Sequence, residues 1–146
     1  MEVGDNVYVA HSVYMAVDTR YPGYIRIEDG CRIGHLNHIV SASSIVIEKD
    51  VLTADRVTIL DASHQYDDTT MPVLKQPLEK LRQVTIGEGS WMGENVCVLG
   101  ASIGKHCIIG ANSVVIEDIP DYSVAVGAPA RVIKQYDKQT KSWRKV

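Results

Sequence analysis

Residues 27–44 read IEDGCR IGHLNH IVSASS, three consecutive hexapeptides that each begin with isoleucine. The same spacing extends in both directions. Ten positions hold one frame, and eight of them are Val or Ile: Val3, Val9, Met15, Tyr21, Ile27, Ile33, Ile39, Ile45, Val51 and Val57. The spacing resumes at Ile86, Met92 and Val98, and again at Ile103, Ile109 and Val115. A period of six matches neither the 3.6-residue helix nor simple strand alternation, so it indicates an internal repeat.

The repeat favours short strands joined by turns. Glycine follows the aliphatic residue in six of the hexapeptides, where it suits a backbone that turns a corner. No window before the C-terminal segment carries the sustained apolar spacing of a helix, which disfavours a helical solenoid. A parallel β-helix, in which aliphatic residues of successive coils stack inside, is the natural solution.

Composition limits the function classes. The chain has 146 residues, 45% of them hydrophobic, and a net charge of −3. These values are ordinary for one globular domain and give no reason to expect nucleic-acid binding. The N-terminus lacks the pattern of a signal peptide, and no segment has the ~20 apolar residues that span a bilayer. Three unclustered cysteines are expected to be free thiols, so we expect a cytoplasmic protein without membrane insertion.

The repeat is interrupted twice. Val57 and Ile86 are 29 residues apart, which is not a multiple of six, so a loop over residues 63–83 is expected to be extruded from the coils. Val98 and Ile103 are five residues apart, which leaves the path of the coil there open. The first interruption begins with Asp61-Ala62-Ser63-His64-Gln65-Tyr66. A histidine on a loop held by a rigid scaffold is a candidate for chemistry.

Two further motifs occur near the C-terminus. Residues 109–115 read IGANSVV, and residues 127–134 read GAPARVIK. Together with the hexapeptides and the D-x-x-H-x-Y motif, they resemble the left-handed parallel β-helix acyltransferases, in particular the sugar and polysaccharide O-acetyltransferase branch. The resemblance implies an all-β left-handed β-helix of about five to six coils over residues 1–133. It also implies a homotrimer. Residues 134–146 form a polar tail, expected to be a short helix or a frayed end.

The resemblance suggests His64 as the catalytic base. A sugar hydroxyl is a poor nucleophile at neutral pH, and an imidazole can accept its proton. Asp61 has three open roles: it holds the imidazole, hydrogen-bonds the acceptor, or caps the turn. Trp91 and His38 are candidate contacts of the acceptor, although a packing role for Trp91 and a plain surface role for His38 remain open.

The co-substrate implied by the resemblance is acetyl-CoA. In the family the final coils and the C-terminal segment bind it in a groove between subunits. The matching positions are Gly93 and Ala111 for the pantetheine arm, and Arg131 and Lys134 for the phosphates. Cations at phosphates make physical sense because charge-assisted hydrogen bonds are strong. A solvated tail is the alternative reading of Arg131 and Lys134.

The sequence therefore predicts an enzyme that transfers an acetyl group from acetyl-CoA to a sugar hydroxyl, with no metal required. N-acetylation of an amino sugar or sugar nucleotide is one alternative. A non-enzymatic β-helix assembly subunit is another. A γ-class carbonic anhydrase shares the coil architecture, but its pair of histidines separated by four residues is absent from this sequence.

Overall fold

The computed structural model describes all 146 residues, and its elements are short strands and one turn of 3-10 helix, η1 (Val73–Lys75). No helix in it is long and apolar enough to cross a membrane. The strands form three long sheets, which are parallel except for the C-terminal end of one of them, and a separate two-stranded antiparallel ribbon.

The three long sheets are named sheets A, B and C. Sheet A contains β1 (Glu2–Val3), β4 (Tyr24–Ile27), β7 (Ser44–Ile47) and β12 (Val84–Ile86). Sheet B contains β2 (Tyr8–Val9), β5 (Arg32–Ile33), β8 (Leu52–Thr53), β13 (Trp91–Met92), β15 (Ile108–Ile109), β17 (Ser123–Val126), β18 (Arg131–Asp137) and β19 (Ser142–Lys145). Sheet C contains β3 (Tyr14–Val17), β6 (His38–Ser41), β9 (Thr58–Leu60), β14 (Cys97–Leu99) and β16 (Val114–Val115).

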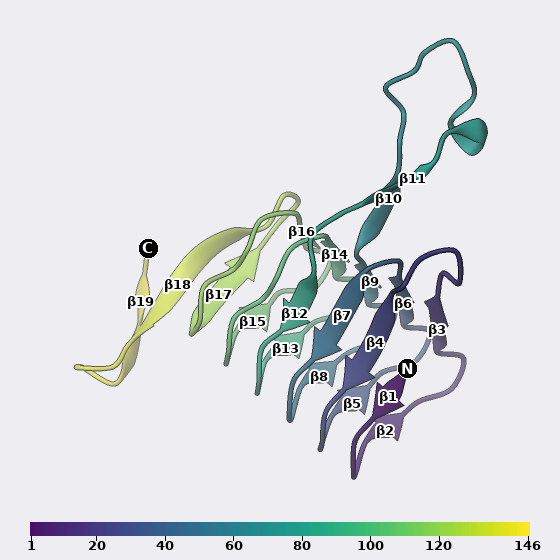
Figure 1. Ribbon diagram of the computed structural model, residues 1–146. Coiled ribbons are helices and arrows are strands. Elements are labelled where there is room, and N and C mark those ends of the chain that lie inside the picture. Colours follow the sequence, from purple (N-terminus) through teal and green to yellow (C-terminus); the bar gives the residue numbers. More distant parts are fainter.

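The chain visits sheets A, B and C in turn, so each circuit makes one coil of a parallel β-helix. Figure 1 shows these coils stacked from the purple N-terminal end to the yellow C-terminal end. Single bridges at Ile103 and Ile119 extend sheet A into the last two coils. The result is five complete coils and the beginning of a sixth, which confirms the predicted number.

The spacing of residues is regular at two corners of the coil and irregular at the third. Within each coil, the interior residue in sheet B follows the interior residue in sheet A by six positions. The interior residue in sheet C follows that in sheet B by the same number. The turn from sheet C back to sheet A, here called the variable corner, comprises residues 18–23, 42–43, 61–83, 100–102 and 116–118. Insertions and deletions are therefore confined to one edge of the molecule.

The register of the third coil corrects the single frame read from the sequence. Ile27 stacks on Ile47 rather than Ile45, because the variable corner adds two residues between the second and third coils. The same shift stacks Ile33 on Thr53 and Ile39 on Ile59. The frame positions in this coil, Ile45, Val51 and Val57, are still buried. They pack inward beside the stacked positions, which is why the six-residue spacing persists through the shift. Tyr21, also in the frame, lies in the first segment of the variable corner and is only half-buried.

The core is a continuous column of aliphatic side chains inside the coils, with 23 buried residues in one cluster. Its residues are isoleucine and valine for the most part, and such branched side chains pack well on pleated strands. The first coil is the exception. Val3 and Val9 are 52% and 39% exposed, because this coil has a neighbour on one side only.

The C-terminal segment is neither a short helix nor a frayed end, so that expectation is wrong. Residues 131–145 form a β-hairpin in which β18 pairs antiparallel with both β17 and β19. Tyr136 and Trp143 face each other across the hairpin in an edge-to-face contact, with ring centroids 5.4 Å apart. The hairpin continues sheet B, and its polar composition reflects an exposed edge, where lysine and arginine discourage further strand pairing.

Candidate active site

His64 is carried on an arm that projects from the variable corner. The arm is built on β10 (Ala62–His64), which pairs antiparallel with β11 (Leu78–Lys80) and places His64 opposite Leu78. Figure 1 shows this ribbon and its tip extending away from the stacked coils. The imidazole is exposed. A paired strand at the base of the arm restricts where the imidazole can lie.

The tip of the arm is held by its own hydrogen bonds. Gln76 is buried, and its Nε2 donates to the backbone oxygens of Asp68 (2.9 Å) and Met71 (3.2 Å). The backbone N–H of Asp68 donates to Gln76 Oε1 at 3.3 Å. Thr70 donates to the Asp68 carboxylate from its N–H and its hydroxyl, which lowers the pKa of Asp68. This role of Gln76 was not predicted from the sequence.

Asp61 lies at the base of the arm and is fully buried. Its carboxylate accepts hydrogen bonds from the Ser41 hydroxyl (2.6 Å) and from the backbone N–H groups of Ala42 (2.7 Å) and Ser43 (3.0 Å). These donors belong to the preceding coil, and His64 is not among them. Of the three open roles for Asp61, the geometry favours capping of the turn over a contact with the imidazole or with the acceptor.

An apolar groove lies on the outer face of sheet B, beside the turn that leads to sheet C. It has a volume of about 400 Å³. The lining residues come from three consecutive coils: Ala54, Trp91, Gly93, Glu94, Ile108, Ile109, Gly110 and Ala111. The structure thus brings together three residues selected from the sequence, Trp91, Gly93 and Ala111. Ala54 and Gly110 were missed, although both occupy the small position after the interior residue of their hexapeptides.

Gly93 is at a point where two coils approach closely. A Cβ atom there would lie 2.8 Å from the backbone N of Ala111 and 3.2 Å from the backbone O of Ile109. The Gly93 N–H donates to that same Ile109 oxygen at 2.8 Å. Only glycine fits this position without moving the backbone, and its small size keeps the groove open.

The row of side chains on this face leads from the groove to the C-terminal hairpin. In register, Trp91 neighbours Ile108, Ile108 neighbours Val124, and Val124 neighbours Lys134. Strands are ~4.8 Å apart, so Lys134 is two strands, or about 10 Å, beyond Ile108. Lys134 is exposed and makes no ion pair.

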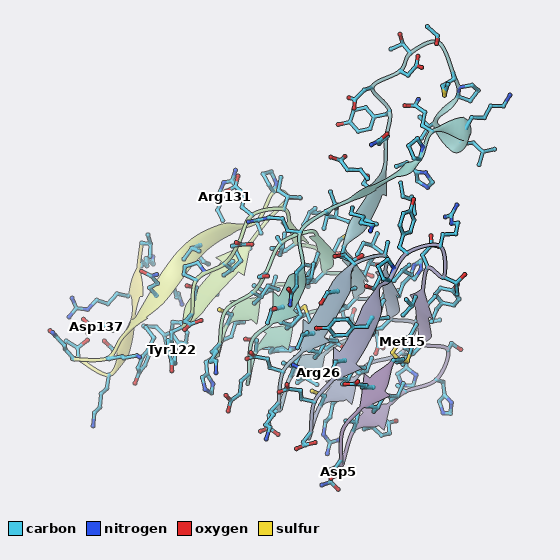
Figure 2. All side chains as sticks on the ribbon, in the orientation of Figure 1. Asp5, Met15, Arg26, Tyr122, Arg131 and Asp137 are labelled. Carbon is cyan, nitrogen blue, oxygen red and sulfur yellow. The ribbon has the colours of Figure 1, made fainter.

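Arg131 differs from Lys134 in having an acidic partner. It lies at the start of β18 (Figure 2), with its Nη1 3.5 Å from Glu117 Oε2 and 3.1 Å from the backbone oxygen of Ala130. Its charge is therefore partly compensated. Of the two cations predicted near phosphates, Lys134 is the freer one.

His38 lies on the outer face of sheet C and is separate from both the groove and the arm. Its ring packs edge-to-face on Tyr14, with centroids 5.1 Å apart. Within one chain, no contact joins it to His64 or Trp91.

The groove and the arm lie at different corners of the same chain. The groove is on sheet B where the chain turns to sheet C, whereas the arm leaves from the turn between sheet C and sheet A. The width of sheet C separates them. A single chain therefore does not bring His64 to the groove.

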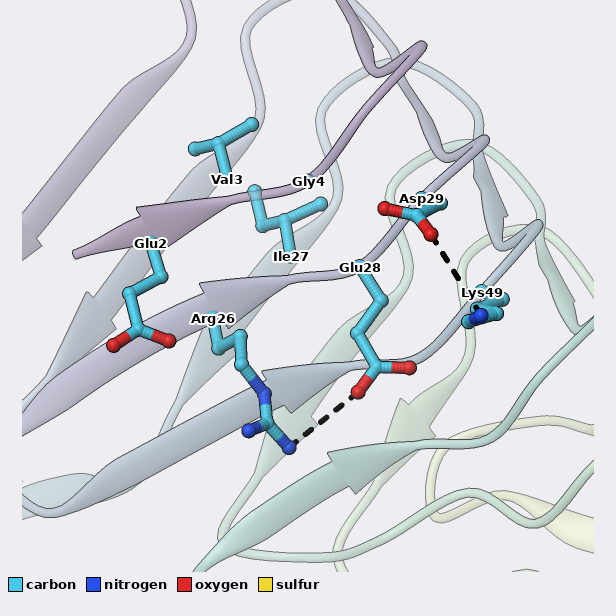
Figure 3. Close-up of a pocket in the computed structure, with 8 residues that line it drawn as sticks. All are labelled: Glu2, Val3, Gly4, Arg26, Ile27, Glu28, Asp29 and Lys49. Carbon is cyan, nitrogen blue, oxygen red and sulfur yellow. Dashed lines mark ion pairs between the residues drawn. The ribbon is translucent and has the colours of Figure 1, made fainter.

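A second hollow, of about 340 Å³, lies on sheet A near the N-terminal end (Figure 3). Four of its five charged side chains pair with one another: Arg26 with Glu28 at 3.4 Å, and Lys49 with Asp29 at 3.6 Å. None of the candidate site residues lines it. The groove on sheet B, which is more apolar and contains the predicted residues, is the better candidate.

The three cysteines are free, and two of them are buried in the core. Cys31 Sγ donates to the Glu48 backbone oxygen at 3.0 Å, and Cys107 Sγ donates to that of Pro120 at 3.1 Å. Burial raises the pKa of both thiols. Cys97 is half-buried, and burial raises its pKa as well. A raised pKa disfavours the thiolate form that a nucleophilic cysteine needs.

Known proteins with the same repeat were found by sequence and by structure. The family described as "Hexapeptide repeat of succinyl-transferase" matches residues 83–118. The chain is 37% identical over 140 residues to the Escherichia coli K12 protein named "Putative lipopolysaccharide biosynthesis O-acetyl transferase WbbJ", covering 91% of this chain and 71% of that protein.

Two solved structures share the fold. One is a point mutant of AntD, an N-acyltransferase from Bacillus cereus, in complex with dTDP-4-amino-4,6-dideoxyglucose and coenzyme A. It superimposes with a TM-score of 0.73 at 18% identity, covering 95% of this chain and 85% of the other. The other is a maltose O-acetyltransferase from Clostridium difficile 630, with a TM-score of 0.58 at 27% identity, covering 94% of this chain and 68% of the other.

The chain therefore belongs to the hexapeptide-repeat acetyltransferase family. The expected left-handed parallel β-helix is confirmed, and so is the assignment to the acetyltransferases. The alternative of a non-enzymatic assembly subunit is not supported.

Proposed function

We propose that this acetyltransferase moves the acetyl group of acetyl-CoA to a hydroxyl group of a sugar or glycan precursor, with His64 as the general base. The observation that carries the proposal is the groove on sheet B, where Trp91, Gly93 and Ala111 come together. The pantetheine chain of CoA is long and narrow, and a groove kept open by small residues suits it. Lys134, at the end of the same row, is suitably placed for a phosphate.

A hydroxyl acceptor is favoured over an amine by the relatives. WbbJ carries O-acetyl transfer in its name and covers most of this chain at 37% identity. The AntD structure, an N-acyltransferase complex, is only 18% identical and supports the fold alone. The name of WbbJ also points to lipopolysaccharide biosynthesis, so a glycan precursor is the acceptor class that we propose.

The reaction needs one proton carrier. A neutral imidazole nitrogen of His64 takes the proton of the acceptor hydroxyl as the oxygen attacks the carbonyl carbon of the thioester. The tetrahedral intermediate then expels the sulfur, which leaves as the CoA thiol with the proton returned by the imidazolium. General base catalysis of this kind contributes about 10²–10⁴-fold to the rate.

We further propose that the working enzyme is a homotrimer in which the arm of one copy reaches the groove of the next. The separation of arm and groove at two corners of one chain supports this arrangement. Closed cyclic assemblies repeat one heterologous contact around an axis, so three copies would give three equivalent sites.

Mixed trimers test this arrangement. His64→Ala and a variant with the groove blocked, Ala111→Trp, are each expected to retain about 1% of the wild-type activity or less. If each site combines an arm from one copy with a groove from the next, one in four contacts in an equal random mixture is intact. The mixture should then recover about a quarter of the wild-type activity. Verified mixed trimers with no recovery would contradict a shared site.

The chemistry of the product tests the acceptor. Acetyl-CoA turnover would be followed with neutral sugars, amino sugars, sugar nucleotides and lipid-linked glycans. An ester product is expected, which hydroxylamine cleaves, whereas an amide survives that treatment. Turnover confined to amino sugars, with a hydroxylamine-resistant product, would overturn O-acetylation and leave the family assignment intact.

A further inference from the structure

Asp61 is the only buried carboxylate of this chain, and no lysine, arginine or histidine is buried. Burying a carboxylate is costly unless hydrogen bonds replace its hydration. Here three donors do so, at 2.6 to 3.0 Å, and all of them lie in residues 41–43 of the preceding coil. We call this set of contacts the clasp.

The backbone of the same residue closes the base of the arm. The Asp61 oxygen accepts a hydrogen bond from the returning chain at Leu81 N, at 2.8 Å. One residue earlier, the Leu60 oxygen accepts from Gly100 N in the next coil, at 2.9 Å. Asp61 thus joins the preceding coil through its side chain and the returning strand through its backbone, three residues before His64.

A residue from another part of the variable corner contacts the ribbon of β10 and β11. Residues that face each other in an antiparallel pair share a face, as do residues two apart on one strand. Ala62 faces Lys80 and His64 faces Leu78, so His64 and Lys80 share one face of the ribbon. The Lys80 ammonium lies 4.8 Å from the centre of the Tyr21 ring, in the first segment of the variable corner. The arm is therefore held at its base from two sides, and the face bearing His64 is the one turned toward Tyr21.

We propose that Asp61 is a positioning residue for His64: the clasp fixes the direction in which the arm leaves the coils, and with it the place of the imidazole. This inference rests on the proposed function, because it assumes that His64 is the base. A catalytic group must be held closely, and a misplacement of ~1 Å can lower the rate about 100-fold. A buried carboxylate with three donors supplies such a fixed point.

Asp61→Asn tests the clasp with little change in volume. Whichever way the amide is turned, its NH₂ group meets a backbone N–H, that of Ala42 or Ser43, and at least one hydrogen bond is lost. We expect kcat to fall about 10- to 100-fold, with the KM for acetyl-CoA unchanged. Hydrogen exchange should quicken in residues 62–80 and stay unchanged in the coils. Ser41→Ala, which removes one donor only, should show a smaller loss of the same kind and serves if Asp61→Asn does not fold.

Asp29→Asn is the matched control. Its carboxylate also joins two coils, by accepting the Asp5 N–H at 2.9 Å, but at another corner. The activity of the Asp29→Asn variant should equal that of the wild type. A double-mutant cycle separates positioning from general stability: if Asp61 acts through His64, Asp61→Asn should have no further effect on the residual turnover of His64→Ala.

The outcomes are distinct. An equal loss from Asp61→Asn in the wild-type and His64→Ala backgrounds would assign the clasp to stability alone and overturn the inference. Wild-type activity of Asp61→Asn, with His64→Ala inactive, would also overturn it while leaving the proposed function standing. Full activity of His64→Ala would instead overturn the proposed function itself.

Discussion

A single methyl group added at Gly93 tests whether the groove is shaped by backbone contact between coils. In Gly93→Ala the new Cβ would lie 2.8 Å from Ala111 N, 3.1 Å from Ala111 Cα and 3.2 Å from Ile109 O. These are backbone atoms, so no side chain can turn aside to make room. Burying a methyl group contributes about 0.8 kcal/mol, but overpacking in a tight interior typically destabilises by about 1–3 kcal/mol net. We expect the free energy of unfolding of Gly93→Ala to fall by an amount in that range.

Gly110→Ala is the matched control in the same groove. The nearest atom to its added Cβ is Val126 Cγ1, at 2.7 Å, on a side chain that is 37% exposed. That side chain can rotate, so the cost should stay below about 1 kcal/mol. The difference between the two variants isolates the backbone contact from the mere presence of a methyl group.

Urea denaturation at a fixed protein concentration measures both variants, since the stability of an oligomer depends on concentration. Calorimetry with acetyl-CoA supplies a second reading. Gly93→Ala should bind acetyl-CoA more weakly, because Ala111 must move to accommodate the methyl group. Equal free energies of unfolding for the two variants, or a neutral Gly93→Ala, would refute the reasoning.

Two further predictions follow from charge and burial. Lys134→Ala should weaken acetyl-CoA binding about 3- to 10-fold at low salt and less at high salt, and Arg131→Ala should weaken it less, because Glu117 already pairs with that guanidinium. Calorimetry at two NaCl concentrations measures the affinity of both variants for acetyl-CoA. A loss of affinity that does not depend on salt would argue against a phosphate contact. Iodoacetamide at pH 8 should modify Cys97 first, because this thiol is only half-buried whereas the other two are buried in the core and out of reach of the reagent. Mass spectrometry follows the order, and faster labelling of a core cysteine would contradict the packing.

The architecture was predictable because one physical pattern repeats. A branched residue every six positions specifies a coil whose interior is aliphatic, and this requirement is visible because it recurs over many consecutive hexapeptides. The two-residue shift before the third coil was not visible. Ile45, Val51 and Val57 are at least as apolar as the residues that actually stack, Ile47, Thr53 and Ile59, so hydrophobicity alone could not reveal the register.

Several residues of the candidate site were predictable from the sequence, but the contacts that hold them in place were not. The motif residues Trp91, Gly93 and Ala111 meet in one groove because they occupy equivalent corners of neighbouring coils. The role of Asp61 depends on donors about twenty residues earlier in the chain, and only the stacking of coils brings them together. A sequence motif gives no hint of such a contact.

The C-terminal hairpin was missed for a different reason. Its strands carry many charged and polar side chains, as an exposed edge does, and this composition is hard to distinguish from that of a frayed tail. Its pairing with β17 depends on a partner that is itself defined only by the last coil.

The central claim is that His64 is the base for acetyl transfer. The most direct measurement compares His64→Ala with the wild type for acetyl-CoA turnover with the best acceptor and for acetyl-CoA binding by calorimetry. We expect turnover to fall about 10²–10⁴-fold while the affinity for acetyl-CoA is unchanged, since in the proposed site the groove residues and Lys134, and not His64, hold acetyl-CoA. Turnover equal to that of the wild type would contradict the claim.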